Sequence, residues 1–288
     1  MTDVQILYAF AHEGQGGNPA GVVLDADPLS TAQKQAIAAQ VGLSETAFVS
    51  RSQVADFKLE FFTSTRQIAH CGHATIATFS HLRQIGRVQE GATSKETIDG
   101  RREILIEGDQ AFMEQQAPGY FVPHEVPAAR IAASLGLAQE ALDREHPPVV
   151  CSTGNRFLLV KVRDAAALAG VRADLHEVAS VSDALDLVGY YAWAPGAGWA
   201  QATTRMFAPR YGISEEAGTG MAAGPLACYL HDRCGIEGRT LLIQQGCYMA
   251  EPSPSRIEVR LDLDSAGAIR RLFAGGRARV GDRIAIPV

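Results

Sequence analysis

A glutamate at the expected end of a short helix is the first residue whose surroundings suggest chemistry. Glu45 follows Gly42-Leu43-Ser44, where the helix should stop, and immediately precedes the apolar run 46–49. This placement predicts that the carboxylate lies at the mouth of a sheet, partly withdrawn from water. Partial desolvation raises the pKa of a carboxyl group toward neutrality, where it can both accept and donate a proton. Glu45 is therefore a candidate general acid/base.

A cysteine and a histidine flank Gly72 at the expected start of a buried helix. A thiol at a helix N-terminus has a lowered pKa, and an imidazole titrates near neutrality. Cys71 and His73 thus have the composition of a nucleophilic pair. Because they are two positions apart, we expect their side chains to diverge. A structural thiol beside a hydrogen-bonding histidine is the alternative that stays open.

Two helices are expected to begin at a glycine, one at Gly72 and the other at Gly220. A helix N-terminus presents unpaired N–H groups and a partial positive charge, which suit a carboxylate or a developing enolate. Glycine also lets a ligand approach the backbone closely. The alternative is that both glycines only permit tight strand-to-helix turns. Glu215 and Glu216 precede the second helix, where acidic residues are also favoured simply as partners of the helix dipole.

Short strands and two kinds of helix must position these residues. Strands are predicted over residues 5–10, 20–24, 46–49 and 57–62. One helix has Ser30 as its N-cap, Gln33 as the partner in a capping box and Gly42 as its stop. Its apolar stripe is predicted to include Ala36, Ile37 and Val41. Residues 74–79 lack a polar face beyond threonines, which predicts a buried helix.

The second half of the chain repeats the first. Residues 17–23 match 154–160, residues 60–63 match 205–208, and residues 71–82 match 219–230, in the same order. Two copies of one unit predict two pseudo-symmetric domains, residues 1–122 and 123–288, with the final strand free to pack back on the first. The connection is expected near residues 117–147, with a short helix around 127–135. A cleft between such halves is a favoured place for a small-molecule site, and both helix starts would point into it.

The overall composition excludes several classes of protein. The 288 residues carry a net charge of −6 with a pI near 5.8, which offers no basic face for nucleic acid. The first residues lack the basic start and apolar core of a signal peptide, and no window is apolar enough to span a membrane. The five cysteines form no CxxC pair, which argues against a structural zinc site. We expect a cytoplasmic protein with reduced thiols.

Several short motifs are spread along nearly the whole chain. They are Gly17-Asn18-Pro19-Ala20, Leu43-Ser44-Glu45-Thr46, Phe62-Thr63 with Cys71-Gly72-His73-Ala74-Thr75, Ser152-Thr153-Gly154, Pro209 with residues 212–220, Gln245-Gly246 with Met249, Pro252 and Ser253, and Gly275-Gly276-Arg277-Ala278. In this order and spacing, the chain resembles the PhzF-type phenazine biosynthesis family, whose fold is that of diaminopimelate epimerase. The resemblance implies an α+β fold of two pseudo-symmetric domains, each a small β-barrel-like sheet around a central helix, and a homodimer.

The resemblance also implies an activity. Phenazine members of the family isomerise trans-2,3-dihydro-3-hydroxyanthranilate without a metal or an organic cofactor. The position of Glu45 moves a proton from one ring carbon to another, and the position of His73 helps to hold the substrate. The predicted partner is therefore a small carboxylate. The residues predicted to bind it are Ser44, Cys71, Gly72, Glu216, Thr219, Gly220 and Met221.

Three departures from the family pattern bear on the substrate. The family commonly has Asp at the position of Glu216 and Ser at the position of Met221, so two polar contacts to the substrate are altered. Epimerase relatives carry a cysteine at each helix start, whereas this chain has Cys71 at one and Thr219 at the other. A two-thiol racemase is therefore disfavoured. An epimerase that uses Cys71 with Glu45, or a binding protein that lost its reaction, are the alternatives.

Overall fold

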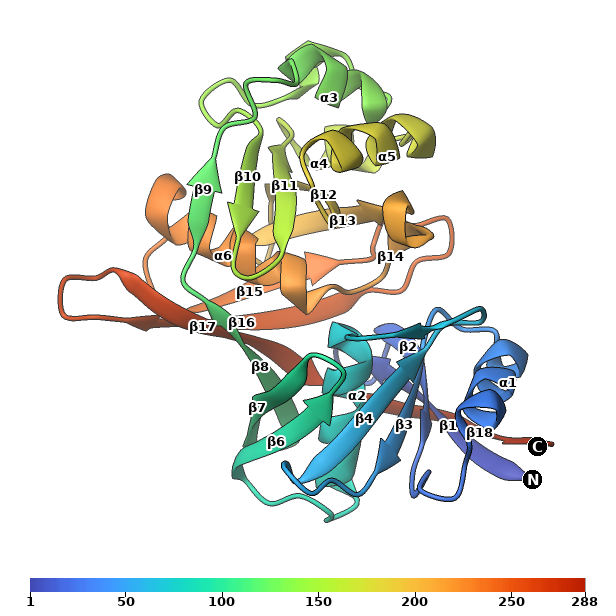
Figure 1. Ribbon diagram of the computed structural model, residues 1–288. Coiled ribbons are helices and arrows are strands. Elements are labelled where there is room, and N and C mark those ends of the chain that lie inside the picture. Colours follow the sequence, from blue (N-terminus) through green and yellow to red (C-terminus); the bar gives the residue numbers. More distant parts are fainter. Residues whose placement is uncertain (288) are drawn as a thin grey trace. The chain divides into compact units, whose positions relative to one another are not determined.

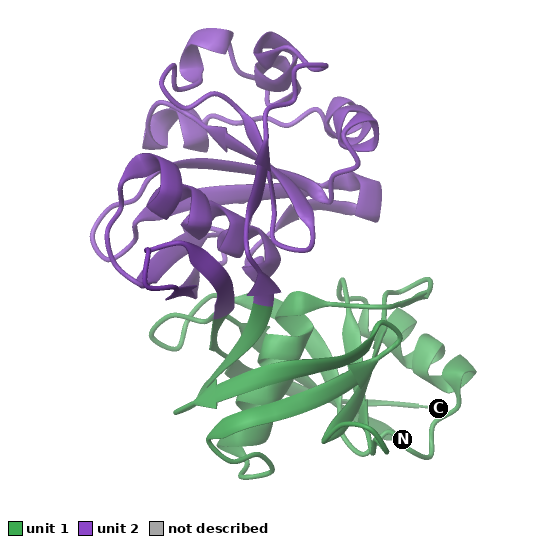
Figure 2. Ribbon diagram, turned by 60° about the vertical axis from the view of Figure 1, so that its left-hand side comes forward, with its two compact units in different colours: residues 1–114, 275–288 green, residues 115–274 purple. Residues whose placement is uncertain are grey.

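The computed structural model describes residues 1–287, and the chain forms two compact α+β units (Figure 2). Unit 1 comprises residues 1–114 and the C-terminal segment from residue 275, and unit 2 comprises residues 115–274. Within residues 1–287, no helix is both long and apolar enough to cross a membrane.

Unit 1 contains two helices among short strands (Figure 1). Its elements are β1 (Thr2–Ala9), β2 (Asn18–Val23), α1 (Thr31–Val41), β3 (Thr46–Ser50), β4 (Phe57–Phe62), β5 (Gln67–Ile68), α2 (Gly72–Gln84), β6 (Gly91–Thr97), β7 (Gly100–Glu107), most of β8 (Gln110–Gln116) and β18 (Arg279–Ile286). The final strand β18 pairs antiparallel with the first strand β1.

Unit 2 has the same kind of construction with additional short helices. Its elements are β9 (Gly119–Phe121), α3 (Ala128–Ser134), the 3₁₀ helix η1 (Gln139–Ala141), β10 (Val149–Ser152), β11 (Arg156–Lys161), α4 (Ala165–Ala169), α5 (Leu175–Ala184), β12 (Gly189–Pro195), β13 (Ala202–Ala208), the 3₁₀ helix η2 (Pro209–Tyr211), β14 (Ile213–Glu216), α6 (Gly220–Cys234), β15 (Thr240–Gln245), β16 (Ser255–Leu263) and most of β17 (Ile269–Arg277).

The strands of the two units pair in the same order. In unit 1, β1–β2, β3–β4 and β6–β7 are antiparallel, whereas β2–β3 and β4–β6 are parallel. In unit 2, β10–β11, β12–β13 and β15–β16 are antiparallel, whereas β11–β12 and β13–β15 are parallel. The sequence matches fall on β2 with β11, β4 with β13 and α2 with α6. The predicted internal repeat is therefore confirmed by the topology.

Each unit wraps its strands around one buried helix. In unit 1, α2 packs against β1, β2, β3, β7 and β18, and residues 72–82 of it are buried (Figure 1). In unit 2, α6 packs against β10, β11, β15 and β16. A helix that is covered on all sides has no need of a polar face, which explains why residues 74–79 of α2 have none beyond threonines. The predicted architecture, a pair of α+β units each with its strands around a central helix, is confirmed.

Helix α1 begins and ends where the sequence predicts. The Ser30 side chain accepts a hydrogen bond from the Gln33 N–H, the Gln33 side chain reaches back to the Ser30 N–H, and Gly42 adopts a left-handed conformation with φ of 69°. The predicted apolar stripe is partly wrong, because Ala36 is exposed. The buried face instead follows Lys34, Ile37, Ala38 and Val41, the spacing of one helix face. Lys34 is buried because it forms an ion pair with Glu60 of β4.

Replacing Ser30 by Ala should lower the free energy of unfolding by about 1 kcal/mol. The variant loses the side-chain acceptor of the capping box while the rest of α1 stays unchanged. Urea denaturation followed by circular dichroism measures the change. Ser64→Ala, at an exposed serine of the same unit, is the control and should leave the midpoint unaltered. An equal midpoint for both variants would mean that the cap does not stabilise α1.

The expected connection between the halves folds into unit 2. Residues 119–121 form β9, which pairs with β10, and the predicted short helix is α3. Val126, Ile131 and Leu135 belong to the hydrophobic core of the unit. The sequence of this segment does not predict that these apolar residues join the core, because they are spaced between exposed residues and its composition is polar and proline-rich.

Candidate active site

Three of the predicted site residues meet at the start of α2 in unit 1. Glu45 lies between α1 and β3, Cys71 is the N-cap of α2, and His73 is the second residue of the helix. The Nε2 atom of His73 lies 3.3 Å from Glu45 Oε2, and its Nδ1 atom lies 3.6 Å from Cys71 Sγ. The imidazole therefore contacts the carboxylate with one ring nitrogen and the thiol with the other.

The expected divergence of Cys71 and His73 is wrong. The prediction rested only on their separation by two positions in the sequence. Cys71 has an extended backbone, with φ of −143° and ψ of 122°, because it caps the helix rather than belonging to it. This turn in the backbone directs the thiol toward the imidazole.

The predicted lowering of the Cys71 pKa is also wrong. Cys71 is 5% exposed, and this burial raises the pKa of the thiol above its ordinary value. The positive end of α2 and the nearby imidazole favour the thiolate, but desolvation is the larger effect. Cys71 is therefore a neutral thiol at neutral pH, which weakens its case as a base or nucleophile.

Glu45 is a buried carboxylate with one oxygen that can accept a further hydrogen bond. It is 7% exposed, and within residues 1–287 its Oε2 atom accepts no hydrogen bond. Buried polar atoms in folded proteins nearly always have partners, so an exception calls for an explanation. This oxygen, which lies beside an imidazole, is therefore able to accept a proton or a hydrogen bond from a bound ligand.

A buried lysine that the sequence pattern does not reveal lies behind this cluster. Lys95 of β6 is fully buried, and its Nζ donates to Thr75 Oγ1 at 2.6 Å, which in turn donates to the Cys71 carbonyl at 2.6 Å. Burial lowers the pKa of Lys95 to about 7. Burial also lowers the pKa of the neighbouring His70 to about 3, so His70 stays neutral. Lys95 thus supports the N-cap of α2 through Thr75.

The shifted lysine predicts a pH dependence of stability. Between its folded pKa of about 7 and its ordinary value of 10.5, the unfolded chain holds a proton that the folded chain has released. The free energy of unfolding should therefore rise with pH in this window, by up to about 1.4 kcal/mol per pH unit from this residue. Below the window this residue should contribute no pH dependence, because the folded and unfolded chains both hold the proton. Urea denaturation at several pH values should show that the free energy of unfolding depends less on pH in Lys95→Met than in the wild type. Lys58→Met, at a partly exposed lysine, should keep the wild-type slope, and a Lys95→Met slope equal to wild type would contradict the prediction.

A second polar cluster surrounds the start of α6 in unit 2. Thr219, the N-cap of α6, donates its hydroxyl proton to Glu216 Oε2 and accepts a hydrogen bond from Gln245 Nε2 at 3.1 Å. Gln245 also donates to the Glu216 carbonyl at 2.7 Å, and its Oε1 accepts from the Thr219 N–H at 3.1 Å and from the Tyr191 hydroxyl at 2.9 Å. Every hydrogen-bonding position of the Gln245 amide is used, so this residue fixes both Glu216 and Thr219.

Gln245 was recognised only as part of a motif, and its structural role depends on the next residue. Gly246 has φ of 83°, and a Cβ atom there would lie 2.3 Å from the Ser253 carbonyl oxygen. Only glycine fits this position. The Gln245-Gly246 signal therefore marks a turn that holds the glutamine against α6, which the sequence alone could not reveal.

The remaining predicted site residues have less direct roles. Gly220 begins α6, and its carbonyl accepts a hydrogen bond from Gln115 Nε2 at 2.9 Å. Met221 is partly exposed, and its sulfur accepts from Asn155 Nδ2 at 3.5 Å. Ser44 is exposed, and Gly72 is buried as the first residue of α2. That the two helix starts share one cleft stays a prediction.

Both helix starts are electrostatically open to an anion. In these two fully described helices, neither N-cap side chain accepts a capping hydrogen bond, and no acidic residue lies in the first turn. Basic residues occupy the last turn of each helix, which complements the negative end of the dipole. The positive end is thus left for Glu45 in unit 1, for Glu216 in unit 2, or for an anionic ligand.

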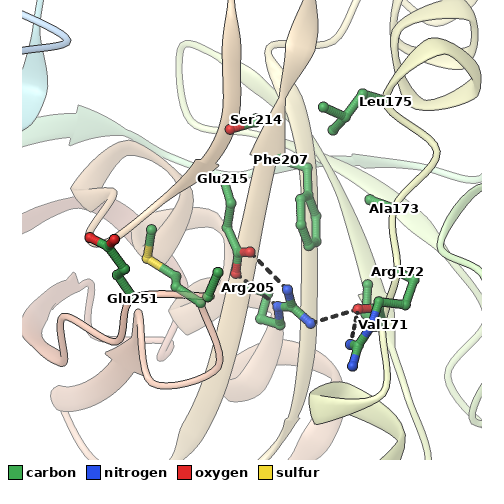
Figure 3. A pocket seen from close by; sticks show the side chains of 11 residues that line it. Val171, Arg172, Ala173, Leu175, Arg205, Phe207, Ser214, Glu215 and Glu251 are labelled. Carbon is green, nitrogen blue, oxygen red and sulfur yellow. Dashed lines mark hydrogen bonds and ion pairs between the residues drawn. The ribbon is translucent and has the colours of Figure 1, made fainter.

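The neighbour of Glu216 has a structural role on the opposite side of β14. Glu215 forms a two-pronged ion pair with Arg205 of β13, with distances of 2.8 Å and 2.7 Å (Figure 3). The pair lies on the wall of a pocket of about 530 Å³ whose other lining residues include Val171, Phe207 and Met249. Glu215 is therefore not a partner of the α6 dipole, which was one alternative from the sequence.

Comparisons with known proteins show the family to which the chain belongs. The pattern of the phenazine biosynthesis-like protein family matches residues 7–280. The chain is 35% identical to an uncharacterized isomerase of Deinococcus radiodurans, over 91% of this chain and 88% of the relative. It is 32% identical to trans-2,3-dihydro-3-hydroxyanthranilate isomerase of Pseudomonas aeruginosa, over 86% of this chain and 87% of that relative. The crystal structure of a PhzF-family phenazine biosynthesis protein of Bacillus anthracis superimposes with a TM-score of 0.90 at 27% identity, covering 100% of this chain and 99% of that one. The chain therefore belongs to the phenazine biosynthesis-like (PhzF) family of isomerases.

Proposed function

We propose that this protein is a cofactor-independent isomerase that moves a proton between two atoms of a small, carboxylate-bearing metabolite. The observation that carries the proposal is Glu45, a buried carboxylate whose Oε2 accepts no hydrogen bond within residues 1–287 and lies 3.3 Å from His73 Nε2. Glu45 would take the proton from one carbon and return it to another. His73 would orient the substrate or assist the transfer.

Charge stabilisation would come from the backbone. Proton removal next to a carboxylate or an unsaturated bond leaves negative charge on the substrate. The N–H groups around Gly72, at the open positive end of α2, would stabilise that charge. In unit 2, Glu216 would contact an amine or hydroxyl of the substrate, because its carboxylate is held by Thr219 beside the open N-terminus of α6.

The substrate is proposed as a class. The relative named trans-2,3-dihydro-3-hydroxyanthranilate isomerase supports a cyclic or unsaturated carboxylate. Glu216 and Met221 replace the aspartate and serine that are common in the family, so a different ring substituent is expected here. The family resemblance further suggests a homodimer, which light scattering coupled to size-exclusion chromatography would test.

Hydrogen exchange from solvent is the direct test of proton transfer. The protein would be incubated in D₂O with trans-2,3-dihydro-3-hydroxyanthranilate and with a panel of small cyclic, unsaturated and amino carboxylates. Mass spectrometry and NMR should find deuterium at a carbon of at least one compound, together with a shifted double bond. Binding of a carboxylate without any exchange into it would instead indicate a protein that kept the site and lost the reaction.

An epimerase that uses Cys71 with Glu45 is the second candidate. The observation that favours it is the position of Cys71 Sγ, which is 3.6 Å from the imidazole and shares the cluster with Glu45. Its high pKa makes the thiol a proton donor rather than a base. Deuterium at a stereocentre, abolished by Cys71→Ser and retained by Glu45→Gln, would favour this reaction.

A further inference from the structure

The cluster at the start of α2 also has the composition of a metal site. Glu45, Cys71 and His73 offer a carboxylate oxygen, a thiol sulfur and an imidazole nitrogen, which are the three kinds of ligand that zinc accepts in proteins. One ligand atom from each residue lies within 4.8 Å of the other two, and all three residues are buried. Among residues 1–287, this is the one group of His, Cys, Asp and Glu side chains with such an arrangement.

The spacing of the donors is close to that of a tetrahedral site. A zinc ion bound at about 2.3 Å from sulfur and about 2.0 Å from nitrogen separates these two atoms by about 3.5 Å. Cys71 Sγ and His73 Nδ1 are 3.6 Å apart. One ion binds only one ring nitrogen, and the 3.3 Å contact of Glu45 is with Nε2. An ion held at Nδ1 would therefore require the Glu45 carboxylate to leave Nε2 and move by on the order of 1 Å, since the ligand atoms lie within 4.8 Å of one another.

Charge balance makes the buried position acceptable for a divalent ion. A doubly charged cation bound by one thiolate, one carboxylate and a neutral imidazole gives a site with no net charge. Burying an ion costs far less when its charge is compensated by its ligands. The Oε2 atom of Glu45 is the independent indication of a missing partner, because it is buried and accepts no hydrogen bond within residues 1–287.

We propose that Glu45, Cys71 and His73 bind a thiophilic divalent cation, with Zn²⁺ as the representative ion, and that this binding reversibly blocks the site. On binding, the Cys71 S–H bond breaks, its proton goes to solvent, and a sulfur–metal bond forms without any change in oxidation state. Three protein ligands leave the fourth position for water. The blocking effect rests on the proposed function, because the metal would occupy the lone pair with which Glu45 takes up the proton.

Cobalt absorption tests the site without any substrate. Reduced protein titrated with Co²⁺ should develop a thiolate-to-cobalt charge-transfer band in the near ultraviolet and the visible bands of a tetrahedral ion, at one equivalent, and Zn²⁺ should abolish both. Cys71→Ser should lose the charge-transfer band. Cys247→Ser, at a half-buried cysteine outside the cluster, should keep it. No band in the wild type, or the same band in Cys71→Ser, would overturn the proposal.

The other two ligands are tested by affinity. His73→Gln and Glu45→Gln keep the thiol and should weaken Co²⁺ binding by at least about tenfold, since loss of even an outer contact has an effect of that size. Circular dichroism and thermal unfolding would show that each variant is folded. If both variants bind Co²⁺ with wild-type affinity, then neither His73 nor Glu45 is a ligand, and the three-ligand site is refuted. These measurements give the same answer whether or not the protein catalyses proton transfer.

Inhibition is measured separately. If D₂O exchange identifies a substrate, Zn²⁺ should suppress the exchange, EDTA should restore it, and a higher substrate concentration should raise the Zn²⁺ needed. If a higher substrate concentration does not raise the Zn²⁺ concentration needed to suppress exchange, then metal and substrate do not compete for one site. That result would refute the proposed blocking effect even where the cobalt band is present.

Discussion

Glu45→Gln should lower turnover by about 10²–10⁴-fold, the usual contribution of general acid/base catalysis, while the protein stays folded. The substitution keeps the size of the side chain and removes its ability to take up a proton. The fold should tolerate it, because Oε2 accepts no hydrogen bond from residues 1–287 that the amide would disturb. The measurement is the rate of deuterium incorporation or of product formation, with thermal unfolding as the check on structure.

The matched control for this prediction is Glu13→Gln. Glu13 belongs to the same unit, but its side chain is 85% exposed, so its rate should equal that of the wild type. Turnover of Glu45→Gln within a factor of about three of the wild type would remove Glu45 from the mechanism. The neutral Cys71 thiol would then be the next group to examine, through Cys71→Ser.

Local features were predictable because their causes lie within a few residues. The ends of α1 depend on Ser30, Gln33 and Gly42, which act on their own backbone. The buried character of α2 follows from its lack of a polar face. The repeat extended this reasoning to the topology, because two copies of one sequence pattern must pair their strands in the same way.

The features that were missed depend on contacts between distant segments. Lys95 lies on a strand of mixed polarity, and nothing in residues 91–97 indicates that its side chain reaches Thr75 of α2. Gln245 contacts Tyr191, which is 54 positions away. The error in the direction of the Cys71 pKa has the same origin. The helix N-terminus is visible in the sequence, whereas the burial that outweighs it is a property of the folded unit.

The site residues are consequently of two kinds. Glu45 and His73 were predicted by family resemblance, and the structure supplies the 3.3 Å contact between them. Lys95 and Gln245 lie behind the two helix starts and support Cys71 and Thr219 respectively. Each helix start thus combines a predicted site residue with a buried polar residue that fixes its position, which is a common requirement for accurate catalytic geometry.

Arg205→Met should be the most destabilising of the substitutions considered, costing about 3–5 kcal/mol of unfolding free energy. The Arg205 side chain is 7% exposed, and it donates to Glu215 through two nitrogens and to the Val171 carbonyl at 2.8 Å (Figure 3). Methionine keeps the apolar contacts but leaves the Glu215 carboxylate, itself only 15% exposed, without its cation. Urea denaturation measures the loss.

Two further variants separate the ion pair from general damage to unit 2. Arg163→Met removes a largely exposed ion pair with Asp164 and should cost at most about 1 kcal/mol. The double variant Arg205→Met with Glu215→Met removes both charges, and it should recover much of the lost stability, because the main penalty is the uncompensated carboxylate. If the double variant is as unstable as Arg205→Met alone, the Val171 contact rather than the ion pair holds β13. Since Glu215 precedes Glu216 on β14, the double variant also shows whether the position of Glu216 depends on this pair, through its effect on substrate affinity.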